Sequence, residues 1–353
     1  MILNLPALKA QLEVHLQQRL KDSEPFSLEL FAHGEANLIY RLNQTSLVRV
    51  AVNTPNQRFQ GDICRVTQFE QTILNYLQGT GISHELQGAV LEPSGNFPYT
   101  YLITNFLEGG PLNYSRTHLF KCAQSLARLH RLPRDPAYAI AHLTPSLPVI
   151  QQPLTLFYNE AKAYAQAYFD FPQAEPAVVE MLQTVLGKAQ SRLQAEALLE
   201  QYPYVCLVHS DHTYDNWVIN DKRACLIDWE WAELGSPAGD LGHFLSPITI
   251  QRYQGYQLRP ADREFFLQTY YNALEDRRLA AIIEKHFAVF GVYPAVRSLC
   301  WTAGYWVTAL RWYEAATEDE SPSAVARMER LHRSRKQFPE LWQSLIEWLD
   351  EEI

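Results

Sequence analysis

The most constraining feature of this sequence is an abrupt change of pattern at Gly109 and Gly110. Before them, short segments alternate apolar and polar residues and are rich in β-formers; after them, apolar residues recur mostly at helical spacing. A sheet and a set of long helices do not share one continuous pattern. The 353-residue length also suits more than one core. We therefore expect an α+β fold with a small antiparallel β lobe, residues 1–108, and a larger helical lobe, residues 109–353.

The β lobe is expected to contain five strands and one main helix. Leucines at helical spacing predict a further helix over residues 1–20. The main helix is predicted in "ICRVTQFEQTILNYLQGTGI", residues 63–82, with Gly79 near its end. The predicted strands are 27–32, 38–42, 46–52, 89–93 and 99–107. In the second lobe the last helix is expected to begin at "FPELW", with Pro339 in its first turn.

Composition narrows the class of partner and the compartment. The net charge of −9 argues against nucleic acid or an anionic membrane, because both need a basic surface. Five cysteines without a CxxC pair indicate a reducing compartment, so we expect a cytoplasmic protein. The first 20 residues lack the features of a signal peptide, and no apolar stretch is expected to span a bilayer. The oligomeric state stays open.

The stretch "LVHSDHTYDNWVINDKRACLIDWEW", residues 207–231, contains the strongest chemical signal. The spacing from His209 through Asp211 to Asn216 matches the H-R-D-x-x-x-x-N loop of phosphoryl-transfer enzymes. Asp211 can accept a proton from an attacking hydroxyl. Asn216 and Asp228 offer oxygen ligands of the kind that Mg²⁺ prefers. A hairpin between them, 217–219 with 224–227, would bring these two ligands together.

This block resembles the aminoglycoside phosphotransferase and choline kinase family, which has a protein-kinase-like fold. The similar motifs are "HSDHTYDN", "IDWE", "GSPAGDL", "HGEANLIYRL", "LVRV", "FEQTILNYL", "YLITNFLEGGPL" and "SLARLH", and they cover roughly residues 25–245. The resemblance implies a two-lobed kinase-like fold. It also implies a phosphotransferase that uses ATP (or GTP) and Mg²⁺ to phosphorylate a hydroxyl of a small acceptor. That acceptor would be like an aminoglycoside, choline or homoserine.

The resemblance also assigns roles to single residues. Arg49 would take the place of the lysine that holds the nucleotide phosphates, and Glu70 would pair with it. The backbone of residues 33–37, including Gly34 and Asn37, would cover the phosphates. Main-chain groups of Asn105 and Leu107 would hold the base. Asp211 would be catalytic, Asn216 and Asp228 would hold the metal, and Asp240 would brace the catalytic loop.

Ser210 is a departure from the family pattern, because a glycine is usual there. We expect serine to be tolerated if its φ is negative. The acceptor pocket is expected in the helical lobe, from the Asp211 loop and helices 155–170 and 299–313. Three carboxylates and several aromatic residues there favour a cationic acceptor; the carboxylates are Glu160, Glu230 and Glu233.

Two alternatives to a kinase remain at this point. One is a kinase-like module that binds nucleotide without turnover, although retention of Asp211, Asn216 and Asp228 argues against it. The other is a metallohydrolase that uses the run His209-Ser210-Asp211-His212 as metal ligands. That class needs further histidine or cysteine ligands, and the sequence has no HxH or HExxH motif, so we rank it last.

Overall fold

The computed structural model of the chain describes residues 4–19, 25–34, 36–54, 56–253, 256–315 and 322–351. These residues form two compact units. The first consists of Met1–Leu112, Ala141–Leu147 and Asn216–Trp231, and the second of Asn113–Ile140, Pro148–Asp215 and Ala232–Ile353. The first unit is built on an antiparallel sheet and the second is mostly helical. The two-lobed α+β fold expected from the sequence is therefore confirmed.

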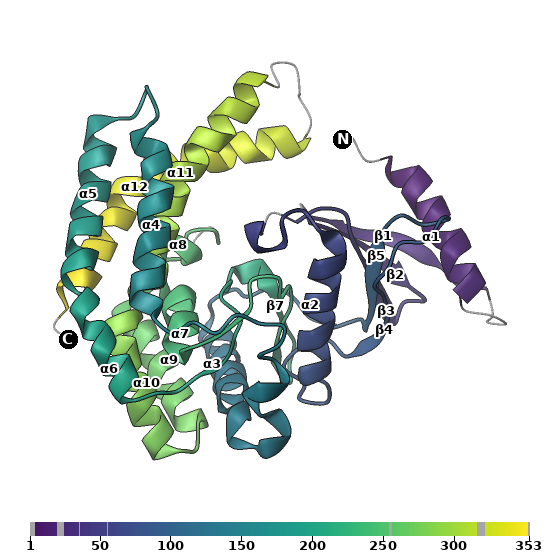
Figure 1. The fold of residues 1–353 in the computed structure, drawn as a ribbon, viewed down its shortest axis with the longest axis horizontal. Helices are drawn as coiled ribbons and strands as arrows, with labels where there is room; N and C mark the ends of the chain where they lie inside the picture. Colours follow the sequence, from purple (N-terminus) through teal and green to yellow (C-terminus); the bar gives the residue numbers. More distant parts are fainter. Residues whose placement is uncertain are drawn as a thin grey trace. The chain divides into compact units, whose positions relative to one another are not determined.

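The first unit is a five-stranded sheet in the order β1-β2-β3-β5-β4, with one helix on each face (Figure 1). Helices α1 (Leu5–Arg19) and α2 (Ile63–Tyr76) are these two helices. The strands lie close to the predicted ones except β4, which was expected at 89–93 and begins three residues earlier. The strands are β1 (Leu28–His33), β2 (Asn37–Leu42), β3 (Ser46–Ala51), β4 (Leu86–Val90) and β5 (Thr100–Asn105).

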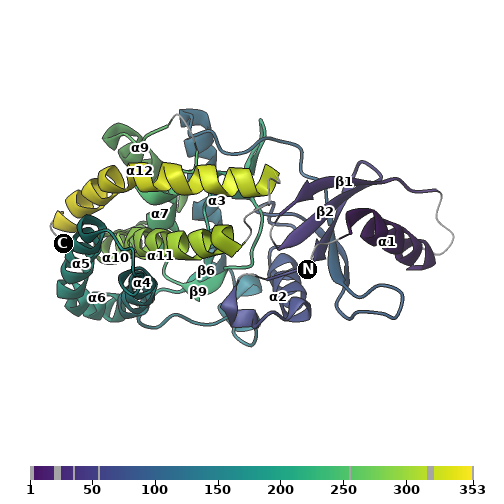
Figure 2. The same ribbon diagram turned by 90° about the horizontal axis from the view of Figure 1, so that it is seen from above.

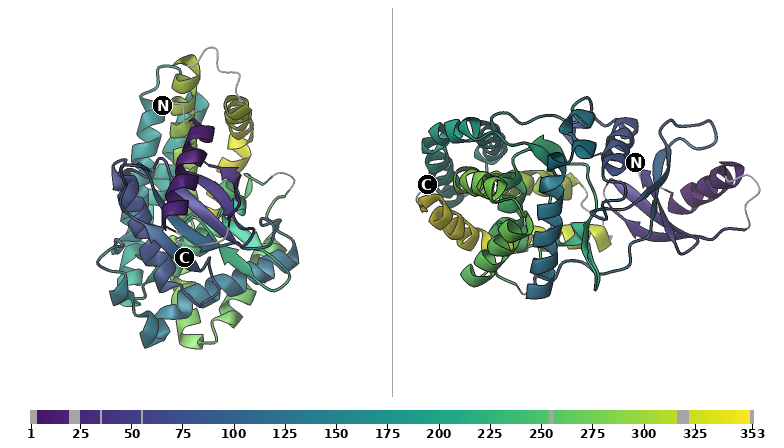
Figure 3. Two further views of the ribbon diagram at one scale, coloured as in Figure 1. Left: turned by 90° about the vertical axis from the view of Figure 1, so that its right-hand side faces the viewer. Right: turned by 90° about the horizontal axis from the view of Figure 1, so that it is seen from below.

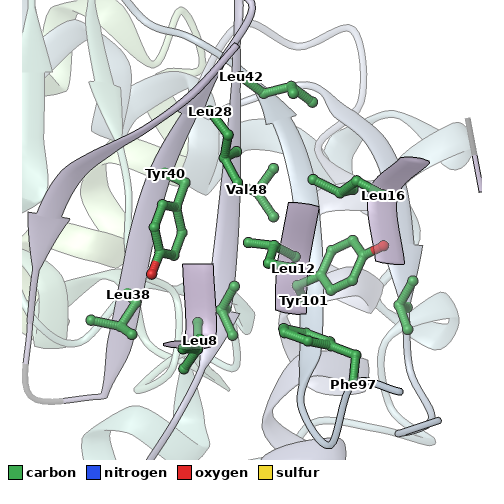
Figure 4. Close-up of a cluster of buried hydrophobic side chains, with 12 residues drawn as sticks. Leu8, Leu12, Leu16, Leu28, Leu38, Tyr40, Leu42, Val48, Phe97 and Tyr101 are labelled. Carbon is green, nitrogen blue, oxygen red and sulfur yellow. The ribbon is translucent and has the colours of Figure 1, made fainter. Parts of the chain in front are cut away.

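Helix α1 covers one face of this sheet, as the left view of Figure 3 shows. Leu8, Leu12 and Leu16 recur every fourth residue, so they share one side of the helix. They are buried in one cluster with Tyr40 and Tyr101 of the sheet (Figure 4). This apolar contact explains why the helical pattern of the first 20 residues holds although propensity alone seldom stabilises a helix of this length.

Helix α2 packs on the opposite face. Its first turn is capped by Asp62, whose side chain accepts hydrogen bonds from the backbone N–H groups of Cys64 and Arg65. Along the helix, the hydroxyls of Thr67 and Thr100 lie 2.7 Å apart, which ties α2 to β5. The helix ends at Tyr76, three residues before the glycine expected near its end.

A hairpin far along the sequence also belongs to the first unit. Strands β7 (Trp217–Ile219) and β8 (Ala224–Leu226) pair as predicted, with Trp217 opposite Leu226. Gly110 exchanges two backbone hydrogen bonds with Ile219, at 2.9 and 2.8 Å. Gly109 has a φ of 150°, and a Cβ there would lie 2.6 Å from the Ile219 carbonyl oxygen. The two glycines at the change of pattern are therefore needed for close contact with β7.

The second unit is a group of helices with one short sheet of β6 (Cys206–Val208) and β9 (Glu233–Gly235). Helices α4, α11 and α12 run side by side (Figures 1 and 2). The helices are α3 (Arg116–Arg131), α4 (Pro153–Phe169), α5 (Pro176–Ser191), α6 (Glu196–Gln201), α7 (Pro237–Leu245), α8 (Pro247–Ile250), α9 (Pro260–Ala273), α10 (Arg277–Phe290), α11 (Tyr293–Ala315) and α12 (Pro322–Asp350).

Helices α7 and α10 approach each other with no side chain between them at one point. A Cβ added to Gly242 in α7 would lie 2.1 Å from the carbonyl oxygen of Gly291, which follows α10. Only hydrogen fits in that space. The contact matters because α7 also contains Asp240 and His243, which are described below.

The expectation that the last helix begins near Pro339 is wrong, because Pro339 lies inside α12. Buried residues continue on one face through the proline, at Leu331, Phe338, Leu341 and Leu345. The apolar contact of this face outweighs the hydrogen bond that the proline removes.

The expectation about membrane spans also needs correction. Among the described residues, the 35-residue stretch Arg277–Arg311 is long and apolar enough to cross a bilayer. It consists of α10 and most of α11, and 67% of its apolar 18-residue segment is buried inside the fold. Core helices pass the same test of length and composition, so this stretch is weak evidence for a span.

Candidate active site

In the first unit, three charged side chains form a buried ion-paired group. Arg49 projects from β3 and donates through Nη2 to Glu70 Oε1 of α2 at 3.1 Å and to Asp228 Oδ1 at 2.9 Å. The side chains of Arg49 and Glu70 are each 5% exposed, whereas that of Asp228 is 37% exposed. The Arg49–Glu70 pair predicted from the sequence is present, and the group has one solvent-accessible carboxylate.

The protonation of this group follows from its charges. Burial alone would lower the pKa of Arg49, but the carboxylates of Glu70 and Asp228 outweigh it, and the pKa is raised. Burial raises the pKa of Glu70 above its usual value. Arg49 and the Trp229 N–H act against that shift without cancelling it. Arg49 therefore stays cationic, and Glu70 is the less readily ionised partner.

Asn216 and Asp228 lie at the open end of the β7–β8 hairpin, as the sequence predicts. The Ile227 N–H donates to the Asn216 carbonyl at 3.0 Å, which continues the ladder beyond Leu226. Trp229 is fully buried and donates through Nε1 to Ser83 Oγ at 2.8 Å, which anchors the residue next to Asp228. An amide oxygen and an exposed carboxylate held this way fit a hard cation such as Mg²⁺.

The buried guanidinium of Arg49 also fits a nucleotide phosphate. Its Nη2 serves both carboxylates, while its Nε is buried and has no hydrogen-bond partner among the described residues. A buried N–H without an acceptor is unfavourable, and a phosphate oxygen would satisfy it with a charge-assisted bond.

The main-chain groups of the other residues assigned to nucleotide binding differ in whether they already have hydrogen-bond partners. The Gly34 N–H donates to the Asn37 carbonyl at 2.9 Å, so it already has a partner; Glu35 lies outside the described residues. The Asn105 N–H donates to Glu85 O at 3.1 Å, so this N–H already has a partner. The Leu107 N–H makes no backbone hydrogen bond within the part of the chain that the structure describes.

His84 is a buried polar residue of the first unit that the sequence did not single out. It is 4% exposed, and neither ring nitrogen has a hydrogen-bond partner of good geometry among the described residues. Burial and, secondarily, the positive charge of Arg49 lower the pKa of His84 to about 3. The ring is therefore neutral at physiological pH.

In the second unit, Asp240 organises the loop that contains Asp211. Its fully buried carboxylate accepts from the backbone N–H groups of His209 at 2.9 Å and Ser210 at 2.8 Å. His130 Nε2 and His212 Nε2 lie 3.0 and 2.9 Å from its two oxygens. Burial alone would raise the pKa of Asp240, but these donors outweigh it and hold the pKa well below its usual value. Its geometry fits the bracing role that the resemblance implies.

Ser210 corrects one detail of the sequence analysis. We expected serine to be tolerated there with a negative φ, but its φ is 65°. The left-handed conformation lets successive N–H groups of His209 and Ser210 both point at Asp240. Ser210 therefore adopts a left-handed conformation, which a glycine would adopt without the steric cost that serine bears.

Asp211 follows Ser210 in the same loop, with its side chain 28% exposed. His243 of α7 lies close to it, with its Nε2 3.9 Å from Asp211 Oδ1, beyond hydrogen-bond distance. The His212 N–H donates to His243 Nδ1 at 3.0 Å, which places the ring proton on Nε2, toward Asp211. Burial, followed by the charge of His212, lowers the pKa of His243 well below its usual value. Sequence reasoning missed His243, although its position one turn after Asp240 was visible.

A cavity of about 180 Å³ in the second unit adjoins this loop. Its lining comes from residues 213–215, from α7, α8 and the residues after α8, and from α11 and α12. The three carboxylates expected in an acceptor pocket lie elsewhere. Glu160 is paired with Arg297 at 3.1 Å, Glu230 belongs to the first unit, and Glu233 is in β9. Trp312 and Tyr313, at the end of the expected aromatic helix, have side chains outside the described residues.

Several solved structures that share this fold are named as phosphotransferases or kinases. An aminoglycoside 2'-phosphotransferase-IIIa in complex with GDP has a TM-score of 0.60 and 15% identity, over 95% of this chain and 99% of that one. A Plasmodium vivax ethanolamine kinase has a TM-score of 0.53 and 14% identity, over 91% and 85%. A choline/ethanolamine kinase family protein from Mesorhizobium loti has a TM-score of 0.51 and 12% identity, over 95% and 97%. At these identities the likeness establishes the kinase-like fold.

The family follows from the sequence itself. The model of the phosphotransferase enzyme family (APH) matches residues 27–282, which is more than half of the chain. The protein therefore belongs to the phosphotransferase enzyme family, as its motifs suggested. No curated protein has significant sequence similarity to it.

Proposed function

We propose that the protein is a kinase that moves the γ-phosphoryl group of ATP or GTP to a hydroxyl of a small molecule. The observation that supports this most strongly is the buried Arg49, which pairs with Glu70 and Asp228 and whose Nε has no acceptor among the residues that the structure describes. Such a group suits an anionic nucleotide and its cation. Similar solved structures contain ADP, GDP or ATP, which supports a nucleotide here.

The transfer needs few groups from the protein. Asn216 and Asp228 would hold Mg²⁺, which supplies charge neutralisation on the phosphates when bound. Asp211 would orient the acceptor hydroxyl and take its proton. The hydroxyl oxygen forms a bond to the γ-phosphorus, the bond from that phosphorus to the β,γ-bridging oxygen breaks, and the nucleoside diphosphate leaves with the bonding electrons. Positioning and charge stabilisation would provide most of the rate enhancement.

For the acceptor we propose only a broad class, a small compound with a hydroxyl group. Similar structures are described as aminoglycoside phosphotransferases and as choline or ethanolamine kinases, so a small hydroxyl compound is the common element. The cationic acceptor expected from the sequence depended on Glu160, Glu230 and Glu233, none of which lines the cavity beside Asp211. A cationic acceptor therefore stays a prediction.

Both alternatives have less support than the kinase. A silent nucleotide-binding module would not need the brace that Asp240 provides to the Asp211 loop. For the metallohydrolase, no group of three histidine, cysteine or acidic residues able to hold a metal occurs within the described ranges. His212 instead contacts Asp240.

The decisive experiment is a transfer assay. Purified protein, Mg²⁺ and γ-labelled ATP are incubated with a metabolite extract and, separately, with denatured protein extract, and an Asp211→Asn variant serves as the control. We expect label in one or a few small molecules, and none with the variant. Label only in protein bands would contradict the acceptor class. Nucleotide binding without any transfer would favour the silent module.

A further inference from the structure

The cavity of about 180 Å³ next to the Asp211 loop lies close to the Asp211 carboxylate. Thr213, two residues after Asp211, lines it, and so does His243, whose Nε2 lies 3.9 Å from Asp211 Oδ1. A small molecule in this cavity would therefore have one end close to the carboxylate that we assign to the hydroxyl. All of the lining residues belong to the second unit.

Two guanidinium groups line this cavity, and neither has a carboxylate partner within the described part of the chain. Arg252 follows α8 and Arg333 lies in α12, 81 positions apart in the sequence. Among the described residues, neither forms an ion pair or a side-chain hydrogen bond, whereas Arg259, Arg263, Arg297 and Arg335 of the same unit all pair with carboxylates. Planar guanidinium groups bind carboxylate and phosphate oxygens in pairs of hydrogen bonds.

An aromatic surface completes this side of the cavity. The rings of Trp301 and Tyr305 in α11 stack with centroids 5.0 Å apart and planes 16° apart. Trp301 is 38% exposed, and the Arg252 guanidinium lies 5.8 Å from its ring centroid. This contact holds the cation beside an exposed apolar surface, where the carbon skeleton of a ligand can pack.

Apart from the two arginines, the side chains of the lining that can carry charge near neutral pH are His243 and Asp215. His243 stays neutral because burial and nearby positive charges, Arg252 among them, lower its pKa. Asp215 is a single exposed carboxylate against two arginines. The lining is therefore net positive, although the whole chain has a net charge of −9. This local reversal of sign favours an anionic ligand and leaves one place for an ammonium group.

We propose that the acceptor bears a carboxylate or phosphate group, which Arg252 and Arg333 bind while the Trp301–Tyr305 surface holds its carbon skeleton. The hydroxyl that receives the phosphoryl group is then presented at the His243 end of the cavity, toward Asp211. This inference depends on the proposed kinase function and narrows it to hydroxy acids, hydroxy amino acids or sugar phosphates. It runs against the cationic acceptor expected from the sequence.

The test identifies the acceptors directly. The full chain is incubated with Mg²⁺, γ-labelled ATP and a metabolite extract, and every labelled product is identified by mass. We expect each preferred acceptor to contain a carboxylate or phosphate group before transfer. Labelled acceptors that all lack an anionic group would overturn the inference and leave the kinase function intact. No labelled product at all would overturn both.

Matched pairs of acceptors sharpen this result. Homoserine with 3-aminopropanol, gluconate with glucitol, and glucose 6-phosphate with glucose differ in the anionic group. For any pair that is phosphorylated, the anionic member should have the higher kcat/KM, by about tenfold or more. The reverse order in every active pair would contradict the proposal.

Variants connect the preference to the two arginines. Arg252→Ala and Arg333→Ala should each raise KM for the anionic acceptor about tenfold with little change in kcat, because the contact is made equally before and during transfer. Lys replacements should restore part of the affinity. Lys336→Ala, an exposed cation of α12 outside the cavity lining, is the matched control and should leave KM unchanged. Unchanged KM in both arginine variants, with wild-type unfolding midpoints, would remove the arginines from the site.

Discussion

Glu70 in the first unit and Asp240 in the second are both buried carboxylates, 4% and 0% exposed, yet their pKa values are shifted in opposite directions. Glu70 has one ion-pair partner, Arg49, and its pKa is raised. Asp240 has two backbone N–H groups and two histidine nitrogens around it, and its pKa is lowered. The number and direction of donors, more than burial, decides whether a carboxylate stays charged.

The two arrangements suit different tasks. Arg49 can exchange partners, because Asp228 is partly exposed and a phosphate oxygen can replace a carboxylate oxygen. Asp240 cannot exchange its donors without unfolding the loop that they hold. The ion-paired group of the first unit therefore suits an adaptable anion site, as proposed, whereas the second unit contains a fixed support for the Asp211 loop. The following predictions test this contrast, from the largest effect to the smallest.

Asp228→Ala should abolish binding of Mg²⁺-nucleotide, whereas Asp211→Asn should keep binding and lower turnover by about 10³-fold. In the proposed mechanism, Asp228 would hold the metal, whereas Asp211 would orient the acceptor. Calorimetric titration with Mg²⁺-ATP and a transfer assay measure the two effects. Equal loss of binding in both variants would break the contrast.

Asp240→Asn should lower the free energy of unfolding by about 3 kcal/mol. The new amide NH₂ would point at N–H groups that now donate to a carboxylate oxygen of Asp240. Urea unfolding at pH 7 measures this. The stability from a lowered pKa is fully present above about pH 3.8 and is lost as the pH falls through the folded value. The loss in the variant should therefore be as large at pH 5 as at pH 7.

Glu70→Gln is the matched comparison for the first unit. The raised pKa of Glu70 contributes stability that is fully present below about pH 4.5 and is lost as the pH rises through the folded value. The glutamine variant should lack that loss. The same pH dependence in the Asp240 and Glu70 variants would show that the two carboxylates do not differ as described.

Arg49→Ala should weaken nucleotide binding about 100-fold and Arg49→Lys less, because lysine keeps the charge but not the planar fork. Alanine also leaves Glu70 without its cation. Nucleotide titration measures the affinity. Wild-type affinity and rate in Arg49→Ala would mean that the group serves only the fold.

His84 should make the first unit sensitive to acid. Its pKa of about 3, against 6.5 when exposed, gives stability that is complete above pH 6.5 and is lost as the pH falls toward 3. At pH 5 the loss amounts to about 2 kcal/mol. His84→Leu should remove this part of the pH dependence. An unchanged profile between pH 7 and 5 in this variant would contradict the assignment.

Ser210→Gly should stabilise the protein by about 0.5–1 kcal/mol, since glycine adopts a φ of 65° without steric cost. Ser210→Ala keeps that cost and is the control. Thermal unfolding compares the three proteins. A destabilised glycine variant would mean that the serine side chain supports the loop.

Local parts of the site could be predicted from the sequence. Asn216 and Asp228 lie twelve positions apart across one hairpin, and the turn and strand pattern alone brings them together. Arg49 lies in β3 and Glu70 in the next helix, α2, and the family motifs indicated the two residues. Their roles in binding stay predictions.

Contacts between distant segments could not be predicted. Nothing in the local sequence indicates that His84 is buried. Arg252 and Arg333 line the same cavity only because α8, α11 and α12 pack together. The left-handed Ser210 was missed because serine rarely adopts that conformation. Each of these features depends on neighbours that lie outside the local sequence.

The contact between Gly242 and Gly291 has a consequence for how this enzyme can vary. Gly242 sits between Asp240 and His243 in α7, so the place of the catalytic loop depends on a backbone-to-backbone contact with no side chain to adjust. With the acceptor bound in the cavity as proposed, related chains could change the acceptor by exchanging side chains of the lining, one at a time. A change of a single methyl group at Gly242 would instead displace the support beneath the chemistry. Substitutions in the cavity lining can thus change specificity, whereas a substitution at Gly242 would disturb the geometry of the Asp211 loop.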